Sequence, residues 1–356
     1  MIEARYGLVV AMVSGLSTLA NCGAPPQPPG TVAPPASSPQ AAGVLRVVEV
    51  SSTAALMTAL LGASPGDDIV VAPGTYTGST SLSGNAGAYF FSGVDGTADN
   101  PITVESADVA NEAILQGATT GSNYVLYITG DHWNVKNLKI TTGKKGIMLD
   151  NASHTQLTGC EIYNIGEEGL HFRDGSSDGL VEHCNIHDTG VVTPGFGEGV
   201  YVGSDELKWR ANGGDFDPAT DRITIRGSTI GPNVAAESVD IKEGSTGTIV
   251  EGCNLLGTGI SGANSADSFI DVKGNGDIIR DNTASRQGNA IIVDAFQVHL
   301  IVAGWGQAAE FTGNTIEFDT NTTGFVVNAA GGTSATASNN TRSPTGNLYT
   351  GNGTVL

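Results

Sequence analysis

The sequence has few basic residues, few aromatics and little cysteine. Lys and Arg total 16 against 36 Asp and Glu, which gives a formal net charge of −20, and aromatic residues make up 6%. Such an acidic chain argues against nucleic acid or an anionic membrane as a partner of the whole surface. Beyond the N-terminal region the remaining cysteines, Cys160, Cys184 and Cys253, are odd in number and cannot complete a disulfide framework.

Glycine, by contrast, is abundant. The 356 residues include 50 glycines, which is about twice the usual share. Glycine at this level indicates many turns rather than long helices, and the chain is long enough to bury a large core. The composition therefore favours an all-β fold.

Long hydrophobic runs are scarce, and the clearest one lies at the N-terminus, from about Gly7 to Ala20. It is too short for a typical membrane-spanning helix and predicts an export signal over residues 1–22. The segment ends in the letters LANC, which resemble a bacterial lipobox with Cys22 as the lipidated residue; an ordinary secretory signal is the alternative. A Pro-rich linker follows over 23–43, so we expect one folded domain over 44–356. We expect a bacterial protein that is secreted, or held at the outer surface by a lipid anchor as its one membrane contact.

Short β-like runs recur at intervals of about 25 residues, each centred on a small or polar residue. The longest interval holds an insertion over 203–221. Coils of this length, with three short strands that pair with the next coil, are typical of a right-handed parallel β-helix. Equivalent residues then stack, so Cys160 and Cys184 form either a disulfide or a buried thiol ladder. The central residues are Asn137, Cys160, Cys184, Ser228, Cys253, Asn282, Asn314 and Asn340.

A second strand recurs in each coil, with apolar residues at two alternating positions that we expect to face the core. The positions between them must face outward, and we expect the chemistry on this outward face. The outward residues are Met148 and Asp150, His171 and Arg173, Tyr201 and Gly203, Asp240 and Lys242, Asp271 and Lys273, and Gln297 and His299.

The outward face repeats an Asp-x-Lys pattern on two neighbouring coils, as VDIK and IDVK. Asp240 would stack on Asp271, and Lys242 on Lys273, at about 4.8 Å. Like charges directly opposite one another in a sheet are destabilising. Either diagonal Asp–Lys pairs neutralise these charges, or a bound cation or polyanionic sugar does so, and both readings stay open.

Acidic residues also recur three positions before the outward residues, in a series that includes Glu168 and Asp294. Carboxylates on successive coils can form the oxygen-only cage that Ca²⁺ prefers, and a solvated acidic corner is the alternative. The candidate metal ligands are Glu198, Glu237, Asp240, Asp267 and Asp271.

Cationic and aromatic residues gather on the same outward face, in a stripe that opposes the charge of the whole chain. The insertion leaves this strand and places Trp209 between Lys208 and Arg210, which suits a sugar platform; a hydrophobic side chain that packs inward is the alternative. The candidate substrate contacts are His171, Tyr201, Lys208, Trp209, Arg210, Gln297 and Trp305.

The segments SPGDDIVVAPGTYTG, GTADNPITVES and GDHWNVKNLKITTG resemble the N-terminal coils of the pectin-lyase-like β-helix superfamily. Within it the chain is most similar to polysaccharide lyases such as chondroitinase B and the alginate lyases of family six, and to family nine pectate lyases. By motif the resemblance covers 47–143, and beyond this it rests on the coil pattern. It implies Ca²⁺-assisted β-elimination from a uronate, in which the metal neutralises the carboxylate and a neutral Lys or Arg takes the proton.

The resemblance and the stacked lysines together point to Lys242 or Lys273 as the base. A base must be neutral when it acts, and a neighbouring cation lowers the pKa of a lysine. The Arg-His-Gly segment that carries the acid in family six is absent, which leaves His299 and Arg173 as candidate acids. Asp240 and Asp271 complete the predicted catalytic set.

We therefore expect a Ca²⁺-dependent polysaccharide lyase that acts as a monomer on an acidic polysaccharide. Other classes stay open on the same fold. One is a glycoside hydrolase that uses Asp240 and Asp271 as its paired carboxylates. Another is a non-catalytic carbohydrate-binding surface protein, and a third is an epimerase, which shares the proton abstraction with a lyase.

Overall fold

The computed structural model describes residues 46–85 and 87–355. The predicted export signal over 1–22, the lipidation site at Cys22 and the linker over 23–43 lie outside the described residues. Within the described part of the chain, no helix is both long enough and apolar enough to cross a membrane.

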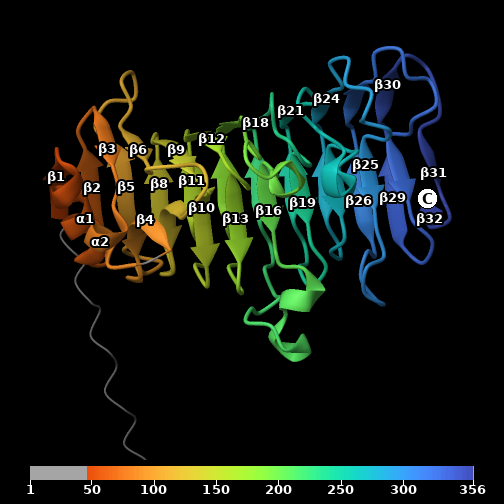
Figure 1. The fold of residues 1–356 in the computed structure, drawn as a ribbon. Coiled ribbons are helices and arrows are strands. Elements are labelled where there is room, and N and C mark those ends of the chain that lie inside the picture. Colours follow the sequence, from red (N-terminus) through yellow and green to blue (C-terminus); the bar gives the residue numbers. More distant parts are fainter. Residues whose placement is uncertain (1–45, 86, 356) are drawn as a thin grey trace, which may run out of the picture. The chain divides into compact units, whose positions relative to one another are not determined.

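Three parallel sheets run side by side along the stack of coils, as Figure 1 shows. Each full coil contributes one short strand to each sheet, and each strand pairs in parallel with its counterpart one coil away. The short strands follow from the sequence, because each apolar run is only a few residues long and ends at a turn. The predicted all-β parallel β-helix is confirmed.

The strands are named by sheet. Sheet A contains β1 (Arg46–Val50), β2 (Asp67–Val71), β5 (Ile102–Ser106), β8 (Trp133–Lys136), β11 (Gln156–Thr158), β14 (Leu180–Glu182), β17 (Thr224–Arg226), β20 (Ile249–Glu251), β23 (Ile278–Arg280), β26 (Ala309–Thr312), β29 (Ser334–Ser338) and β32 (Thr354–Val355). Sheet B contains β3 (Thr75–Thr77), β6 (Ile114–Gln116), β9 (Lys139–Gly143), β12 (Glu161–Ile165), β15 (Asn185–His187), β18 (Thr229–Ile230), β21 (Asn254–Leu256), β24 (Thr283–Ser285), β27 (Thr315–Glu317) and β30 (Thr341–Ser343). Sheet C contains β4 (Ala88–Ser92), β7 (Tyr124–Ile128), β10 (Lys145–Asp150), β13 (Leu170–Arg173), β16 (Val200–Val202), β19 (Val239–Ile241), β22 (Ile270–Val272), β25 (Phe296–Val298), β28 (Val327–Ala329) and β31 (Tyr349–Gly351).

The runs centred on small or polar residues are turns between sheets A and B, not the middles of strands. Their central side chains stack inside the coil. The amide of Asn282 donates to Oδ1 of Asn314 at 3.0 Å, and that of Asn314 donates to Oδ1 of Asn340 at 2.9 Å. This ladder satisfies buried amides that would otherwise carry a desolvation penalty, so the polar column stabilises the interior.

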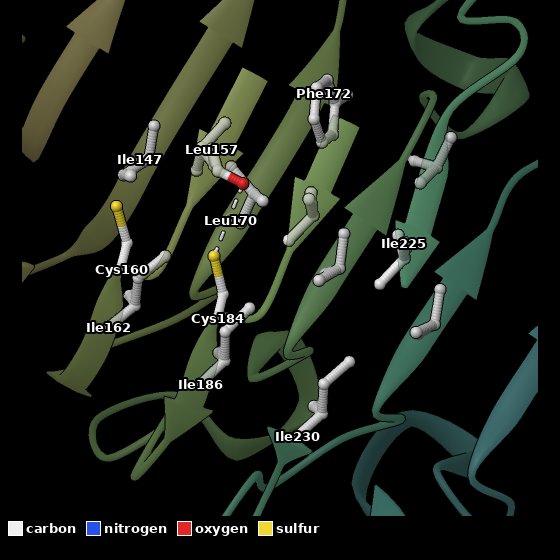
Figure 2. Packing of buried hydrophobic residues seen from close by; sticks show 14 of the residues in the cluster. Ile147, Leu157, Cys160, Ile162, Leu170, Phe172, Cys184, Ile186, Ile225 and Ile230 are labelled. Carbon is white, nitrogen blue, oxygen red and sulfur yellow. Dashed lines mark hydrogen bonds between the residues drawn. The ribbon is translucent and has the colours of Figure 1, made fainter. Parts of the chain in front are cut away.

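Free thiols occupy the same column nearer the N-terminus. Cys160, Cys184 and Cys253 are all buried and unpaired by any disulfide. Figure 2 shows Cys160 and Cys184 among aliphatic side chains of neighbouring coils, with the Cys184 thiol directed at the Leu157 carbonyl 3.7 Å away. The structure has the buried thiol ladder and not the disulfide.

Helix α1 (Thr53–Leu61) covers the N-terminal end of the core. Ser52 caps it by accepting a hydrogen bond from Ala55 N at 3.2 Å, and Leu56, Met57 and Leu60 are buried against β1, β2 and β4. A covered end protects the first strands from pairing with another chain. The one-turn helix α2 (Thr80–Ser83) lies beside it.

Loops between strands carry the remaining short helices. The segment after β16 leaves the coil and projects beyond the ends of the sheet C strands (Figure 1), with η2 (Glu206–Lys208) and η3 (Arg210–Asn212). Two loops that enter sheet C from sheet B hold η1 (Pro194–Phe196) and η4 (Ala263–Ser265). These two loops meet, because Asn264 Nδ2 donates to the Gly195 carbonyl at 3.1 Å.

Candidate active site

A cleft of about 620 Å³ lies over the outward face of sheet C, where η1, η4 and the insertion approach it. Its lining is rich in charged side chains of both signs, with a concentration of lysines that contrasts with the net charge of −20. The lining residues are Lys144, Lys145, Glu167, Glu168, His171, Arg173, Phe196, Glu198, Tyr201, Ser204, Asp205, Lys208, Phe216, Glu237, Asp240, Lys242, Asn264 and Lys273.

The register of sheet C places the predicted outward residues in one column. His171 pairs with Tyr201, Tyr201 with Asp240, and Asp240 with Asp271. The apolar residues between them, such as Val239 and Ile241, are fully buried in the core. Alternation along each strand therefore presents His171, Tyr201 and Asp240 to the cleft.

Lys273 neutralises the stacked aspartates. Its Nζ lies 2.5 Å from Oδ1 of Asp240 and 3.3 Å from Oδ2 of Asp271. Burial alone would lower the pKa of Lys273, yet the carboxylates of Asp240, Asp271 and Glu237 raise it well above its ordinary value. The prediction that Lys273 acts as a neutral base does not hold, because its ammonium is buried between two carboxylates. Of the two readings of the Asp-x-Lys repeat, the diagonal pairing is present.

Asp271 and His299 contact each other and are not among the residues that line the cleft. Ser268 Oγ donates to Oδ1 of Asp271 at 2.7 Å, and His299 Nε2 lies 3.3 Å from Oδ2. Burial raises the pKa of Asp271, but Lys273, His299 and Ser268 together bring it well below its usual range. Asp271 contacts the lining residue Lys273, whereas the predicted roles of Asp271 and His299 as catalytic groups have no support from the lining itself.

Lys242 and Tyr201 come from neighbouring coils and both line the cleft. Nζ of Lys242 lies 5.8 Å from the centroid of the Tyr201 ring, 4.0 Å from Oδ2 of Asp240 and 3.8 Å from Oε2 of Glu243. Gly203 stands opposite Lys242 and leaves room for the lysine side chain, because a Cβ at Gly203 would lie 3.1 Å from the Cβ of Lys242. Its φ of 94° also favours glycine. Burial, followed by Asp240 and three glutamates, raises the pKa of Tyr201 well above its usual range, so Tyr201 is a neutral phenol.

His171 supports Tyr201 from the preceding coil. Its ring packs edge-on at 4.4 Å between centroids, and its Nε2–H donates to the Gly203 carbonyl at 2.9 Å. Burial lowers the pKa of His171 despite the attraction of Glu168. Glu168 in turn forms an ion pair with Lys145.

Three carboxylates converge at the side of the cleft. Ligand oxygens of Glu198, Glu237 and Asp240 all lie within 4.8 Å of one another. Burial, then the charges of Asp271 and Asp240, raise the pKa of Glu237 to about 8, and burial raises that of Glu198 well above its ordinary value. Oε2 of Glu198 is buried and has no hydrogen-bond partner among the described residues.

An oxygen-only set with mutual repulsion and an unpartnered buried oxygen fits a Ca²⁺ ion. The other two predicted ligands are not part of this set. Asp267 accepts a hydrogen bond from Gln297 Nε2 at 2.7 Å, and Asp271 pairs with Lys273.

Arg173 forms one wall of the cleft as a fixed cation. It donates to both oxygens of Asp150, at 2.7 and 2.6 Å, and its guanidinium lies 4.1 Å from the centroid of the Phe216 ring. Burial would lower the pKa of Arg173, but Asp150 raises it well above its ordinary range. Arg173 therefore suits binding of an anion rather than proton donation.

The insertion contributes to the cleft through different residues from those predicted. Trp209 is 9% exposed, its Nε1 donates to the Ser204 carbonyl at 2.9 Å, and its ring meets that of Trp305 edge-on at 6.4 Å between centroids. Neither tryptophan lines the cleft, so the sugar-platform prediction does not hold for either. Arg210 pairs with Asp174 at 2.7 Å, outside the cleft, whereas Lys208 does line it.

Several cleft residues escaped the sequence analysis. Lys144, Lys145, Phe196, Phe216 and Asn264 come from loops or from a strand end, where no periodic pattern identifies the side that a residue faces. One signal was present for Lys144 and Lys145, which precede the outward pair of their own coil. Two adjacent lysines in a chain of net charge −20 could have singled out that position.

The fold and the cleft define a right-handed parallel β-helix protein, and two family profiles match the chain. The profile described as "Right handed beta helix region" matches residues 123–354, and that described as "Pel9A-like, right handed beta helix region" matches residues 36–198. The chain therefore belongs to the right-handed β-helix family within the pectin-lyase-like superfamily, as the sequence predicts.

Among solved structures, the chain is similar to an alginate lyase from Paenibacillus sp. str. FPU-7, with 52% identity and a TM-score of 0.82 over 87% of this chain and 100% of that one. This similarity over the whole of a relative places the chain among the polysaccharide lyases. Pectate lyase L of Dickeya chrysanthemi is 27% identical over 159 residues, which are 41% of this chain and 36% of that protein, so the match spans about a third of that relative's length. Pectate lyase Pel9A, with 16% identity and a TM-score of 0.53 over 89% of this chain and 78% of that one, shares the fold.

Proposed function

We propose that the protein cleaves alginate, or a closely related polymer of uronic acids, by β-elimination in the sheet C cleft. The observation that carries the proposal is the meeting of Tyr201 and Lys242 in a lysine-lined cleft of an acidic protein. The 52% identity to an alginate lyase supports alginate as the substrate. An extracellular site of action, expected from the N-terminal sequence, suits a polymer too large to enter a cell.

The cationic walls would hold the carboxylates of the polymer. Arg173 presents a fixed guanidinium, and Lys208 is exposed on the insertion with no carboxylate within ion-pair distance among the described residues. Lys144 lies 3.4 Å from Glu167 and remains partly exposed. Such a stripe attracts a polyanion in spite of the net charge, because field lines concentrate in a cleft.

The elimination needs a base for the C5 proton and an acid for the leaving O4. Lys242, in its neutral form, takes the proton from C5 through its Nζ, and the electron pair forms the C4–C5 double bond as the C4–O4 bond breaks. Tyr201 donates its phenolic proton to the leaving oxygen, which its raised pKa permits because the phenol stays protonated. One product has a new reducing end, whose anomeric hydroxyl retains O4. The other has an unsaturated uronate at its non-reducing end.

The carboxylates of Glu198, Glu237 and Asp240 are the residues that would hold Ca²⁺. A bound Ca²⁺ would neutralise the substrate carboxylate and so acidify C5–H. This chain's own contribution is to keep the three carboxylates in place: Asp240 through Lys273, and the two glutamates through burial.

The test is an assay of the purified full chain on alginate, polygalacturonate, glucuronan and dermatan, with added Ca²⁺ or with EDTA. We expect the ultraviolet absorbance of the unsaturated product to rise on alginate and to fall when EDTA is present. New reducing ends without that absorbance would instead identify a hydrolase. The paired carboxylates that a hydrolase would use do not support it, because Asp240 and Asp271 are both bound to Lys273. Absence of the absorbance on every uronate in the presence of Ca²⁺ would refute the proposal.

A further inference from the structure

A second group of carboxylates lies where the insertion meets the coil that carries Lys242. Its members are Asp205, Glu206 and Glu243, and their ligand oxygens all lie within 4.8 Å of one another. Asp205 and Glu206 belong to the insertion, whereas Glu243 directly follows Lys242 on the β-helix. Three carboxylates this close repel one another unless protons or a cation lie between them.

Glu243 is the buried member of the group and has an unpartnered oxygen. Its side chain is 0% exposed, and Oε1 accepts a hydrogen bond from Glu206 N at 2.9 Å. Oε2 has no hydrogen-bond partner within the described residues, and Nζ of Lys242, at 3.8 Å, is beyond hydrogen-bonding distance. Oε2 of Glu206 is also buried without a partner. Two such oxygens carry a desolvation penalty that a bound cation would offset.

We infer that Asp205, Glu206 and Glu243 bind a Ca²⁺ ion that fastens the insertion to the β-helix. The donors are all oxygens, which favours Ca²⁺ over transition metals, and a loop supplies the adaptable geometry that about six to eight oxygen ligands require. Backbone carbonyls and water would complete the shell. This site shares no residue with the cluster of Glu198, Glu237 and Asp240. The inference does not rest on the proposed activity.

Binding at this position would shape the cleft. Asp205 lines it and caps the short helix η2, which ends at Lys208, so an ion that holds Asp205 would also hold the wall that carries Lys208. Without the ion, the insertion is held to Glu243 by one hydrogen bond from a backbone amide. We therefore expect Ca²⁺ to protect the insertion from proteolysis as well as to raise the melting temperature.

Terbium luminescence can report on this site because Trp209 lies beside it. The ring of Trp209 packs on Gly244, next to Glu243, since a Cβ at Gly244 would lie 2.8 Å from the ring. A Tb³⁺ ion bound to Glu243 would therefore be close to Trp209 and emit when tryptophan is excited at the red edge of its absorption band, where tyrosine does not absorb. Added CaCl₂ should displace the Tb³⁺ and remove the emission.

Three variants of the full chain make the test specific. Glu243→Gln keeps the shape and the acceptor for Glu206 N but removes the charge, and we expect it to weaken Ca²⁺ competition by about tenfold or more. Asp215→Asn, an exposed carboxylate in the same insertion, and Glu237→Gln, in the other cluster, should retain the emission and its displacement. The inference would be overturned if Glu243→Gln kept the emission and the Ca²⁺ affinity of the unaltered protein. It would also be overturned if millimolar CaCl₂ did not displace Tb³⁺ from the unaltered protein.

Discussion

Nζ of Lys273 lies 2.5 Å from Oδ1 of Asp240, one coil away, and 3.3 Å from Oδ2 of Asp271 on its own strand. This diagonal bridge explains how the chain tolerates two aspartates that face each other in register. One ammonium serves both carboxylates, while the second lysine of the repeat, Lys242, makes no hydrogen bond through Nζ among the described residues. Two residues that look equivalent in the sequence therefore have different surroundings: Lys273 bridges both aspartates, whereas Lys242 lines the cleft with its nearest carboxylates 3.8 to 4.0 Å away.

Replacing Lys273 with methionine should destabilise the fold. Removing one partner of a buried ion pair leaves the other charge uncompensated and costs about 3 to 5 kcal/mol, and here two carboxylates lose their partner. Urea denaturation should show this loss as a lower midpoint at unchanged slope. Lys136→Met is the matched control, because its Nζ lies 3.9 Å from Glu105 at the surface and should contribute about 1 kcal/mol or less. Equal losses in the two variants would contradict the bridging role of Lys273.

Glu168 should make the fold sensitive to acid. Although burial raises its pKa, His171 and Lys145 lower it from 4.5 to about 2 in the folded protein. Because the folded pKa is lower than the ordinary one, the stabilisation is fully present above pH 4.5 and is lost as the pH falls towards 2. A shift of this size corresponds to on the order of 3 kcal/mol. Comparison of unfolding free energies of Glu168→Gln and the unaltered protein from pH 7 to acid should therefore show a difference that shrinks below pH 4.5; a constant difference would rule out this linkage.

The fold could be predicted from the sequence because its cause is local and repeated. Each coil repeats the same pattern of apolar positions, so a wrong assignment in one coil is corrected by its alignment with the next coil. Strand alternation then determines which residues face outward. The outward column from His171 to Asp271 follows directly from that alternation. The turn ladder was assigned to strand centres because a single polar residue between apolar ones looks the same in a strand as in a tight turn.

The cleft could be predicted only in part, because loops and diagonal contacts have no period. The prediction for Lys273 relied on the stacked lysine to lower its pKa and on a metal to occupy the aspartates, whereas Asp240 and Asp271 bind Lys273 directly and raise its pKa. Trp209 packs inward, against Gly244 and Trp305, instead of facing the cleft. Phe216, at the far end of the insertion, reaches Arg173 through the folding of that loop, which no local pattern records.

The asparagine ladder should contribute to the stability of the fold. Asn314 accepts hydrogen bonds from Asn282 and donates to Asn340 and to the Ile279 carbonyl, all in the interior. Asn314→Ala leaves buried groups on two neighbouring coils without partners, at about 1 to 3 kcal/mol for each. Thermal unfolding should therefore show a marked loss for this variant and little change for Thr336→Ala, an exposed strand position of the same region. A loss no larger than that of Thr336→Ala would indicate that the ladder contributes no net stability.

The pairing of Tyr201 with Lys242 makes the sharpest prediction about catalysis. Tyr201→Phe removes one oxygen from a ring that keeps its packing against His171, so the fold should survive while the leaving group loses its proton donor. We expect kcat on alginate to fall by about 10²- to 10⁴-fold with KM little changed, because the phenol acts in the transition state and not in binding. The kcat of Lys242→Ala on alginate should fall by at least the same factor. Tyr163→Phe, an outward tyrosine on sheet B that stacks on His187, controls for loss of a hydroxyl and should keep full activity. Because both proposed groups serve one elimination, the kcat of the double variant should be only slightly lower than that of the less active single variant. If the two fold-losses in kcat multiply instead, Tyr201 and Lys242 act in separate steps.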